Sequence, residues 1–388
     1  MRLSRLWVGG VLACGWVMSL PASSYSDSGI THEAIIVRHV APQKYHDSIG
    51  FEVPRPVLQR AVTAAANGRN KRPQPEPGPT GQGRAVLWQA PDNIRSRDLF
   101  YGPGGKDHTP DSTYTFVKED LAGSHPKFDV RDENDVKWKV KLGSEARPEV
   151  AATRLVWAVG YFANEDYFLP EIQVGNLPAR LHRGQKLVGP GGIVRNVRLK
   201  RVLEGEKKVG IWPWRANPFV GGRELNGLRA MMALLNNWDS KDVNNSIYEE
   251  KHPKAAEGPD EIYMVSDLGS SFGTARLTWP DPTPAGSLKA YAHSRFISKV
   301  TPEYVDFDVP RRPAMIIFFN LPEFLSRLPL RSIAKEIPRS DARWIGHLLA
   351  QLSPDQVRAA FRAAGYTPDE VDGLAKVVEK RISELNGL

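Results

Sequence analysis

The feature that most constrains the fold is an apolar run between Glu224 and Asn236. The helix that this run would form carries large apolar side chains on almost every face: Leu225, Leu228, Met231, Met232, Leu234 and Leu235. A helix that is apolar all round is stable only when other elements cover it. The rest of the chain must therefore supply the elements that surround this helix.

A polar segment, residues 236–245, follows the helix directly. Moving a phosphoryl group needs a carboxylate near the incoming hydroxyl, a cation on the phosphate and oxygen ligands for magnesium. Asp239, Lys241 and Asn244 supply these three kinds of group. Downstream, Asp267 would join Asn244 as a ligand, because Mg²⁺ usually takes only one or two carboxylates from a protein. The alternative interpretation is that Asp239 is a solvated loop acid.

Residues 1–24 are typical of a secretory signal peptide. Two arginines precede an apolar run from Leu6 to Leu20, and small residues follow as a cleavage region. The run of about 15 residues is shorter than the roughly 20 that span a bilayer, which disfavours an uncleaved anchor. The sequence therefore predicts a periplasmic or extracellular protein without a transmembrane span in its mature chain.

Cys14 is the single cysteine of the chain. Residues 11–14 resemble a bacterial lipobox, but the apolar run continues after Cys14, which favours ordinary cleavage over lipoprotein anchoring. Cleavage near residue 24 would remove this cysteine. The mature chain is then expected to contain neither a disulfide nor a thiolate metal site.

The formal net charge of +8 and the pI of about 9.4 suggest a nucleic-acid partner, because basic proteins neutralise phosphates. The basic residues are scattered, however. Their densest clusters, residues 198–201 and 207–208, lack the interleaved aromatic residues of single-strand binders. We therefore expect a solvated basic surface and no specific nucleic-acid partner.

Proline divides the chain near residues 72–81, where four prolines fall within ten residues. Such a segment is typical of a linker. We assign residues 25–95 to an N-terminal extension that includes this linker. The 388 residues, 41% of them hydrophobic, suffice for one large core or two lobes.

Two strands are predicted after the linker, over residues 113–118 and 137–142. In the second strand, Trp138, Val140 and Leu142 would share one face, and Lys137, Lys139 and Lys141 the other. One interpretation is an edge strand that its lysines protect from pairing. The other interpretation is that a lysine of this strand forms a functional ion pair with Glu149. Pro148 and Glu149 begin the next helix, which is predicted to end near Gly160.

The order of these segments resembles that of the protein-kinase-like superfamily. Residues 123–128, Lys141 and Glu149 are similar to the N-lobe of bacterial toxin kinases of the HipA type, with Gly-x-x-Pro-Lys at the phosphate-side turn. The spacing Asp-x-Lys-x-x-Asn at residues 239–244 resembles the kinase catalytic loop, and Asp267-Leu268-Gly269 resembles the Asp-Phe-Gly metal motif. Phosphatidylinositol kinases and other atypical kinases share these C-lobe elements.

The resemblance implies an α+β class and a two-lobed protein-kinase-like fold. Residues 96–210 would form an antiparallel β N-lobe with one helix, and residues 211–345 a mainly helical C-lobe. It further implies ATP and Mg²⁺ as cofactors, and a phosphotransferase acting on a hydroxyl-bearing acceptor of unknown identity. The alternative is an exported pseudokinase that binds nucleotide or acts as a scaffold.

The resemblance also assigns roles to single residues. Lys141 and Glu149 would position ATP, with Lys139 as the second choice for the lysine, while Gly123, Ser124 and Lys127 would lie against the phosphates. Asn244 and Asp267 would hold Mg²⁺, Asp239 would orient the acceptor, and Lys241 would neutralise charge on the transferred group. The chain departs from the usual pattern in lacking Gly-x-Gly-x-x-Gly and in having Trp238 before the catalytic aspartate.

Two capping boxes predict a C-terminal helical hairpin over residues 346–388. Ser353-Pro354-Asp355-Gln356 and Thr367-Pro368-Asp369-Glu370 both place a proline at the first helical position. Elsewhere, residues 249–260 are expected to form an exposed hairpin loop, and residues 315–319 a short apolar strand or helix. We expect Trp212 and Trp214 to pack in the interior, and His125 and His182 to be ordinary surface or turn histidines.

Overall fold

The computed structural model describes residues 84–123, 125–250, 260–274, 285–310 and 329–388. The predicted signal peptide, the predicted proline-rich linker, Ser124 and the apolar segment 315–319 lie outside the described residues, so those predictions remain untested. The described residues belong to one compact unit of helices and sheets. The prediction of an α+β protein is therefore confirmed.

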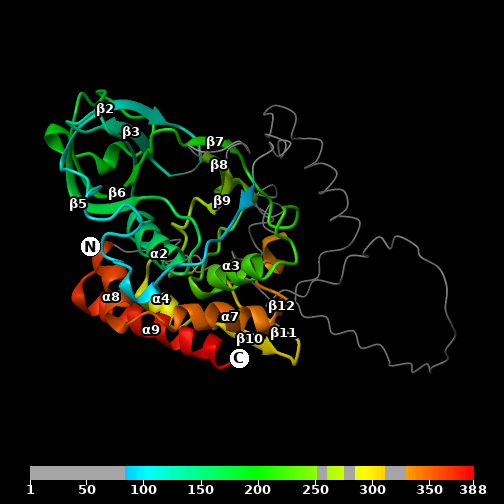
Figure 1. Cartoon of the computed structure of the whole chain (residues 1–388). Coiled ribbons are helices and arrows are strands. Elements are labelled where there is room, and N and C mark those ends of the chain that lie inside the picture. Colours follow the sequence, from blue (N-terminus) through cyan, green and yellow to red (C-terminus); the bar gives the residue numbers. More distant parts are fainter. Residues whose placement is uncertain (1–83, 124, 251–259, 275–284, 311–328) are drawn as a thin grey trace, which may run out of the picture. The chain divides into compact units, whose positions relative to one another are not determined.

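Five strands close into a small barrel in the order β2-β3-β4-β6-β5 (Figure 1). Their bounds are Thr113–Asp120 for β2, Lys127–Arg131 for β3, Lys137–Leu142 for β4, Asp166–Gly175 for β5 and Ile193–Arg201 for β6. Four of the pairings are antiparallel, but β2 and β5 run parallel where the barrel closes. The prediction of an antiparallel sheet is wrong at this point, because an odd number of strands cannot close with antiparallel pairs alone.

The strand β4 is hydrogen-bonded along both of its edges, to β3 on one side and to β6 on the other. The edge-strand interpretation is therefore wrong. Trp138, Val140 and Leu142 are buried in the barrel core, as their alternation predicted. The lysines of β4 consequently lie on the outer face of the barrel.

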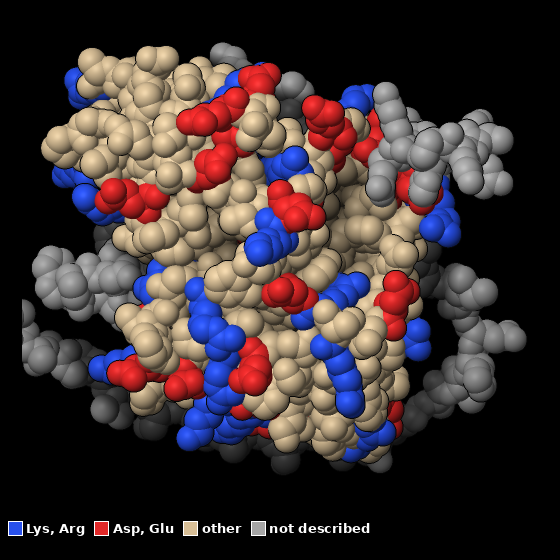
Figure 2. Space-filling model, turned by 60° about the vertical axis from the view of Figure 1, so that its left-hand side comes forward, with Lys and Arg blue, Asp and Glu red and all other residues tan. Residues whose placement is uncertain are grey.

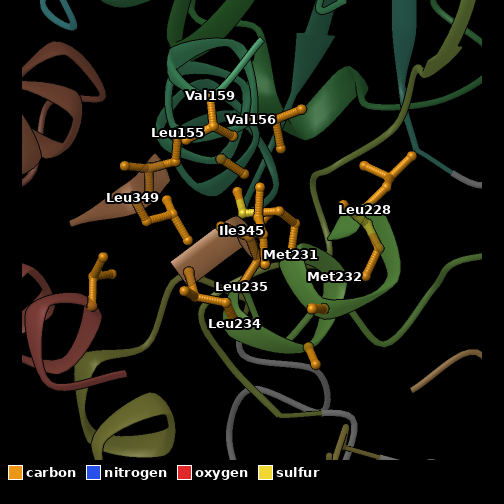
Figure 3. Close-up of a cluster of buried hydrophobic side chains, with 14 of the residues drawn as sticks. Leu155, Val156, Val159, Leu228, Met231, Met232, Leu234, Leu235, Ile345 and Leu349 are labelled. Atoms are coloured by element: carbon orange, nitrogen blue, oxygen red, sulfur yellow. The ribbon is translucent and has the colours of Figure 1, made fainter. Parts of the chain in front are cut away.

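Three helices meet in the larger core beside the barrel: α2 (Ala146–Ala158), α3 (Arg223–Leu234) and α7 (Arg339–Leu349). Figure 3 shows side chains of all three in contact, with Met231 of α3 facing Ile345 of α7 and the underside of α2. The apolar side chains of α3 are almost completely buried. The prediction that this helix is covered on all sides is confirmed.

A second sheet has the order β1-β9-β8-β7, with bounds Ala85–Val86, Asp260–Val265, Asn245–Glu250 and Lys207–Gly210. The strands β8 and β9 form a hairpin whose last pair is Glu250 and Asp260, so the tip of the predicted hairpin loop lies outside the described residues. Residues 84–95, which the sequence assigned to the N-terminal extension, supply β1 and the buried Leu87 and Ile94.

The C-terminal part combines a third sheet with a helical hairpin. The sheet contains β10 (Ile297–Val300), β11 (Tyr304–Phe307) and β12 (Ile337–Pro338). The helices are α4 (Leu288–Ala292), α8 (Pro354–Ala363) and α9 (Pro368–Asn386), and both predicted capping boxes are present. Single 3-10 turns occur at Ile94–Ser96, Gln185–Leu187, Pro190–Gly192, Asp242–Asn244 and Pro329–Ser332.

Arg381 fastens α9 to the end of α3. Its guanidinium donates hydrogen bonds to the carbonyls of Ala233 and Leu234 at 3.2 and 2.9 Å, and lies 4.2 Å from the ring centre of Tyr291. These carbonyls belong to the last turn of α3, where that of Ala233 also accepts from the amide of Asn236 at 3.0 Å and that of Leu234 from the hydroxyl of Tyr291 at 2.6 Å. The helix that precedes the polar segment 236–245 is thereby held at its C-terminal end.

Charge on the face drawn in Figure 2 is mixed, with lysine and arginine side chains interspersed among aspartate and glutamate. In the described part of the chain, no helix has the length and apolarity that crossing a bilayer requires.

Candidate functional site

Lys141 is the one lysine of β4 that the neighbouring elements bury. Only 2% of the residue is exposed, whereas the side chains of Lys137 and Lys139 are 35% and 43% exposed and pair with Asp129. The difference arises because α2 begins five residues after Lys141, and Glu145 and Glu149 at the start of this helix both bind its ammonium. Lys141 rather than Lys139 is therefore placed against the helix.

Three carboxylates surround the ammonium of Lys141. Its Nζ atom donates to Oε2 of Glu149 at 2.8 Å, to Oε2 of Glu145 at 2.9 Å and to Oδ1 of Asp267 at 2.9 Å. Burial alone would lower the pKa of Lys141, but Glu149, Asp267 and Glu145 together raise it above its ordinary value. Lys141 is thus a permanent buried cation that joins β4, α2 and the segment around Asp267.

Arg198 of β6 provides a second cation behind this cluster. Its Nη2 lies 3.0 Å from Oε1 of Glu149, and its Nε lies 3.6 Å from Oδ1 of the buried Asp166. One carboxylate oxygen of Glu149 therefore binds Lys141 and the other binds Arg198, and together these bonds fix the orientation of the Glu149 side chain. Burial raises the pKa of Glu149, whereas Arg198 and Lys141 oppose that rise.

Asp267 is held as an anion. Burial favours its neutral form, but the charge and the hydrogen bond of Lys141, with a further bond from the amide of Gly269 at 3.2 Å, lower its pKa to about 2. Its side chain keeps 38% of its surface exposed, in contrast with Glu145 and Glu149. Asp267 is therefore a charged oxygen donor that solvent or a ligand can reach.

Glu145, immediately before α2, is a member of the cluster that sequence reasoning missed. Besides Lys141, it accepts a hydrogen bond from Ser270 Oγ at 3.1 Å and lies 3.2 Å from Nδ1 of His125. A Cβ atom at Gly269 would lie only 2.7 Å from Cβ of Glu145. The signal in the sequence was its spacing, since Glu145 lies four residues from both Lys141 and Glu149.

The polar segment 236–245 lies beside the segment that carries Asp267. The amide of Phe272 donates to the carbonyl of Leu235 at 2.7 Å, and the amide of Ser266 donates to the carbonyl of Asn244 at 2.8 Å. Asn236 starts the segment with φ = 59°, a left-handed conformation that asparagine tolerates better than most residues. These two hydrogen bonds hold the predicted catalytic loop alongside the segment that contains the predicted metal motif.

Asp239, Lys241 and Asn244 contact one another within this loop. The Nζ atom of Lys241 lies 3.5 Å from Oδ1 of Asp239, and Nδ2 of Asn244 donates to the carbonyl of Asp239 at 2.6 Å. The side chains of Asp239 and Lys241 are 25% and 24% exposed. The predicted site residues thus form two groups, the Lys141 cluster and the Asp239 loop, which the backbone bonds of residues 244 and 266 connect.

The predicted phosphate-side turn joins β2 and β3. Gly123 has φ = 68°, a value that favours glycine, and Arg183 donates hydrogen bonds to the carbonyls of Gly123 and Asp120. Lys127 pairs with Lys141 across the β3–β4 ladder and lies 3.9 Å from Asp120. Burial lowers the pKa of Lys127, and Asp120 partly offsets that effect. The turn is therefore next to the Lys141 cluster, with Lys127 beside it.

The remaining aromatic and histidine predictions concern side chains near the second sheet and β2. Trp212 and Trp214 are buried and meet edge to face with ring centres 5.0 Å apart. The indole of Trp212 donates to the carbonyl of Met264 at 3.1 Å, so the packing interpretation is confirmed. His182 is 76% exposed and pairs with Glu119.

The donor set near Asp267 matches the preferences of magnesium. The Asp267 carboxylate and the Asn244 amide oxygen are hard oxygen ligands, and Nδ2 of Asn244 is already used by the Asp239 carbonyl. Within the described residues, no three His, Cys, Asp or Glu side chains converge as a metal-binding set. Two hard oxygen ligands of this kind suit a cation that takes few protein ligands and completes its shell with phosphate and water.

No protein-family model matches the chain, and no curated protein matches it. Among solved structures, the chain is similar to a Helicobacter pylori proinflammatory kinase, CtkA, with a TM-score of 0.41 and 10% sequence identity. The alignment covers 72% of this chain and 97% of that one.

Proposed function

We propose that the protein is an ATP- and Mg²⁺-dependent phosphotransferase, an atypical kinase with a two-lobed protein-kinase-like arrangement. The barrel and α2 would form the N-lobe, and α3 with the C-terminal helices would form the C-lobe. The acceptor is a hydroxyl-bearing molecule of unknown identity. The sequence of residues 1–24 supports an exported protein, and the scattered basic residues, mixed with acidic ones on the face in Figure 2, support the absence of a specific nucleic-acid partner.

The observation that carries this proposal is the position of Lys141 between Glu149 and Asp267. The three residues come from a strand, a helix and a distant loop, yet both carboxylates lie within 2.9 Å of one buried ammonium. Kinases require such a lysine, steadied by a helix glutamate, next to the aspartate that holds the metal. A purely structural ion pair has no need of a partly exposed third member.

Each residue would contribute a defined step. Lys141 would bind phosphate oxygens of the nucleotide, while Glu149 and Arg198 hold its side chain in place. The acceptor hydroxyl would form a bond to the γ-phosphorus as the bond to the leaving diphosphate breaks. Asp239 would accept the proton of that hydroxyl, and Lys241 would neutralise charge on the transferred group.

Asn244 and Asp267 would hold Mg²⁺, with the remaining ligands coming from phosphate oxygens and water. The ion supplies positive charge at the phosphates during transfer. The low pKa of Asp267, about 2, supports this role, because the carboxylate stays ionised across the physiological range. Gly123 and Lys127 would lie against the phosphates from the β2–β3 turn, with Ser124 between them in the sequence.

Phosphoryl transfer from γ-labelled ATP tests the proposal. The purified protein is incubated with ATP and Mg²⁺, and release of phosphate to water or to the protein itself is followed. We expect slow Mg²⁺-dependent turnover that Asp267→Asn abolishes. Asp239→Asn should reduce turnover by about 10²-fold or more while ATP binding persists. Full Mg²⁺-dependent transfer by Asp267→Asn would overturn the assignment.

A further inference from the structure

The ammonium of Lys141 has no hydrogen left for a nucleotide. An ammonium carries three N–H donors, and Glu149, Glu145 and Asp267 accept one each at 2.8, 2.9 and 2.9 Å. Lys141 is also only 2% exposed. A phosphate oxygen can therefore bind Lys141 only if one of the three carboxylates leaves.

Glu149 is the carboxylate least able to leave. It is 1% exposed, and its second oxygen is fixed by Arg198 at 3.0 Å. A buried carboxylate that loses one of its cations has no route to water, so its displacement is costly. Asp267 is more exposed, but the proposed function requires it close to the phosphates as the metal ligand.

Glu145 is the carboxylate that can be released. It precedes α2 as the N-cap residue and makes no side-chain capping bond there. Ser270 Oγ at 3.1 Å and His125 at 3.2 Å already contact it, so both oxygens keep polar partners when Lys141 turns away. Its release leaves the Lys141–Glu149 pair intact.

Electrostatics favour the same exchange. Three carboxylates, Glu145, Glu149 and Asp267, share the one ammonium of Lys141. A phosphate would add further negative charge beside this ammonium, where three anions already lie. Like charges at this spacing repel strongly where solvent is excluded.

We propose that Glu145 occupies the position of a nucleotide phosphate on Lys141 and competes with it, so that phosphate binding requires Glu145 to move. This inference rests on the proposed function, because it concerns the same lysine. Glu145 would weaken phosphate binding in the resting protein, because its carboxylate already occupies Lys141. Glu145 would thereby set the nucleotide concentration at which the site fills.

Isothermal titration with ATP and Mg²⁺, and separately with tripolyphosphate, tests the inference on wild type and Glu145→Gln. Glutamine keeps the shape that packs on Gly269 but removes the charge. We expect Kd to fall by roughly 10-fold to 100-fold, the range that corresponds to one hydrogen bond to a charged group. Glu149→Gln is the matched control and should bind more weakly than wild type.

Glu145→Asp provides a second variant if Glu145→Gln does not fold, because aspartate is a favourable N-cap residue and its shorter side chain withdraws from Lys141. It should also tighten binding. Equal or weaker binding by the Glu145 variants, with measurable binding by wild type, overturns this inference and leaves the proposed function standing. Absence of binding by every protein overturns the proposed function, and this inference with it.

Discussion

The Nζ atom of Lys141 lies 2.9 Å from Oδ1 of Asp267, although 126 positions separate the two residues in the chain. This bond connects the barrel to the segment that follows β9. Glu149 shares the same ammonium at 2.8 Å, so one buried cation links three elements. The stability of the protein and its proposed chemistry therefore depend on the same side chain.

Lys141→Met should destabilise the protein by about 3–5 kcal/mol, because the buried Glu145 and Glu149 each lose a cationic partner. The matched control is Lys139→Met on the same strand. Lys139 is partly exposed, and its partner Asp129 keeps Lys137 at 3.3 Å, so we expect a loss of about 1 kcal/mol or less. Urea unfolding measures both. Equal losses in the two variants would contradict the distinction between them.

Asp267 should make stability depend on pH in acid. Its pKa is about 2 in the folded protein against an ordinary 3.8, so its contribution is complete above about pH 4 and is lost as pH falls toward 2. The free-energy difference between wild type and Asp267→Asn should therefore shrink over this window. Urea titrations at pH 6, 4 and 3 measure the difference. A constant difference would contradict the low pKa.

The sequence predicted the members of the Lys141–Glu149 pair because helices and strands have fixed periods. The alternation of β4 separated its lysines from its apolar residues, and an acid early in the next helix marked Glu149. Periodicity did not show that the wall around β4 closes into a barrel, since closure depends on the pairing of β2 with β5, far apart in the chain.

Other parts of the site depend on tertiary contacts that no local pattern encodes. Arg198 was visible only as one member of a basic cluster, and its role as the partner of Glu149 follows from the register of β4 with β6. Glu145 lay within the spacing of four residues, but its contact with Ser270 requires the segment after Asp267 to return to α2. Such long-range contacts are decided by the packing of the helices.

Gly269→Ala should disturb the cluster without changing any charge. A Cβ at this position would lie 2.7 Å from Cβ and from Oε2 of Glu145, so one of the two must move. We expect a loss of about 1–3 kcal/mol in the free energy of unfolding. At Gly210, by contrast, the nearest atom is 3.5 Å away, and Gly210→Ala should be nearly neutral. Thermal unfolding of the two variants compares them.

Asn244 and Asn245 should behave differently although they are adjacent. Asn244→Ala removes a proposed magnesium ligand and should raise the Mg²⁺ concentration needed for ATP binding by roughly 10-fold. Asn245 is buried and donates to the carbonyl of Trp212 at 2.9 Å, so Asn245→Ala should cost about 1–3 kcal/mol of stability.

Magnesium titrations at fixed ATP, combined with urea unfolding, separate these two effects. The prediction for Asn244 is contradicted if Asn244→Ala and wild type need the same Mg²⁺ concentration. It is equally contradicted if Asn245→Ala, once folded, shows the larger change in Mg²⁺ dependence.

In the proposed function, Lys141 and Asp267 bind ATP and Mg²⁺ together. A thermal-shift titration of wild type, Lys141→Ala and Asp267→Ala with ATP, with and without Mg²⁺, measures this binding. At 100 times Kd, bound nucleotide should stabilise the wild type by about 2.7 kcal/mol. We expect a Mg²⁺-dependent rise in Tm for wild type that both variants lose. The absence of a shift in wild type, or a full shift in either variant, would contradict it.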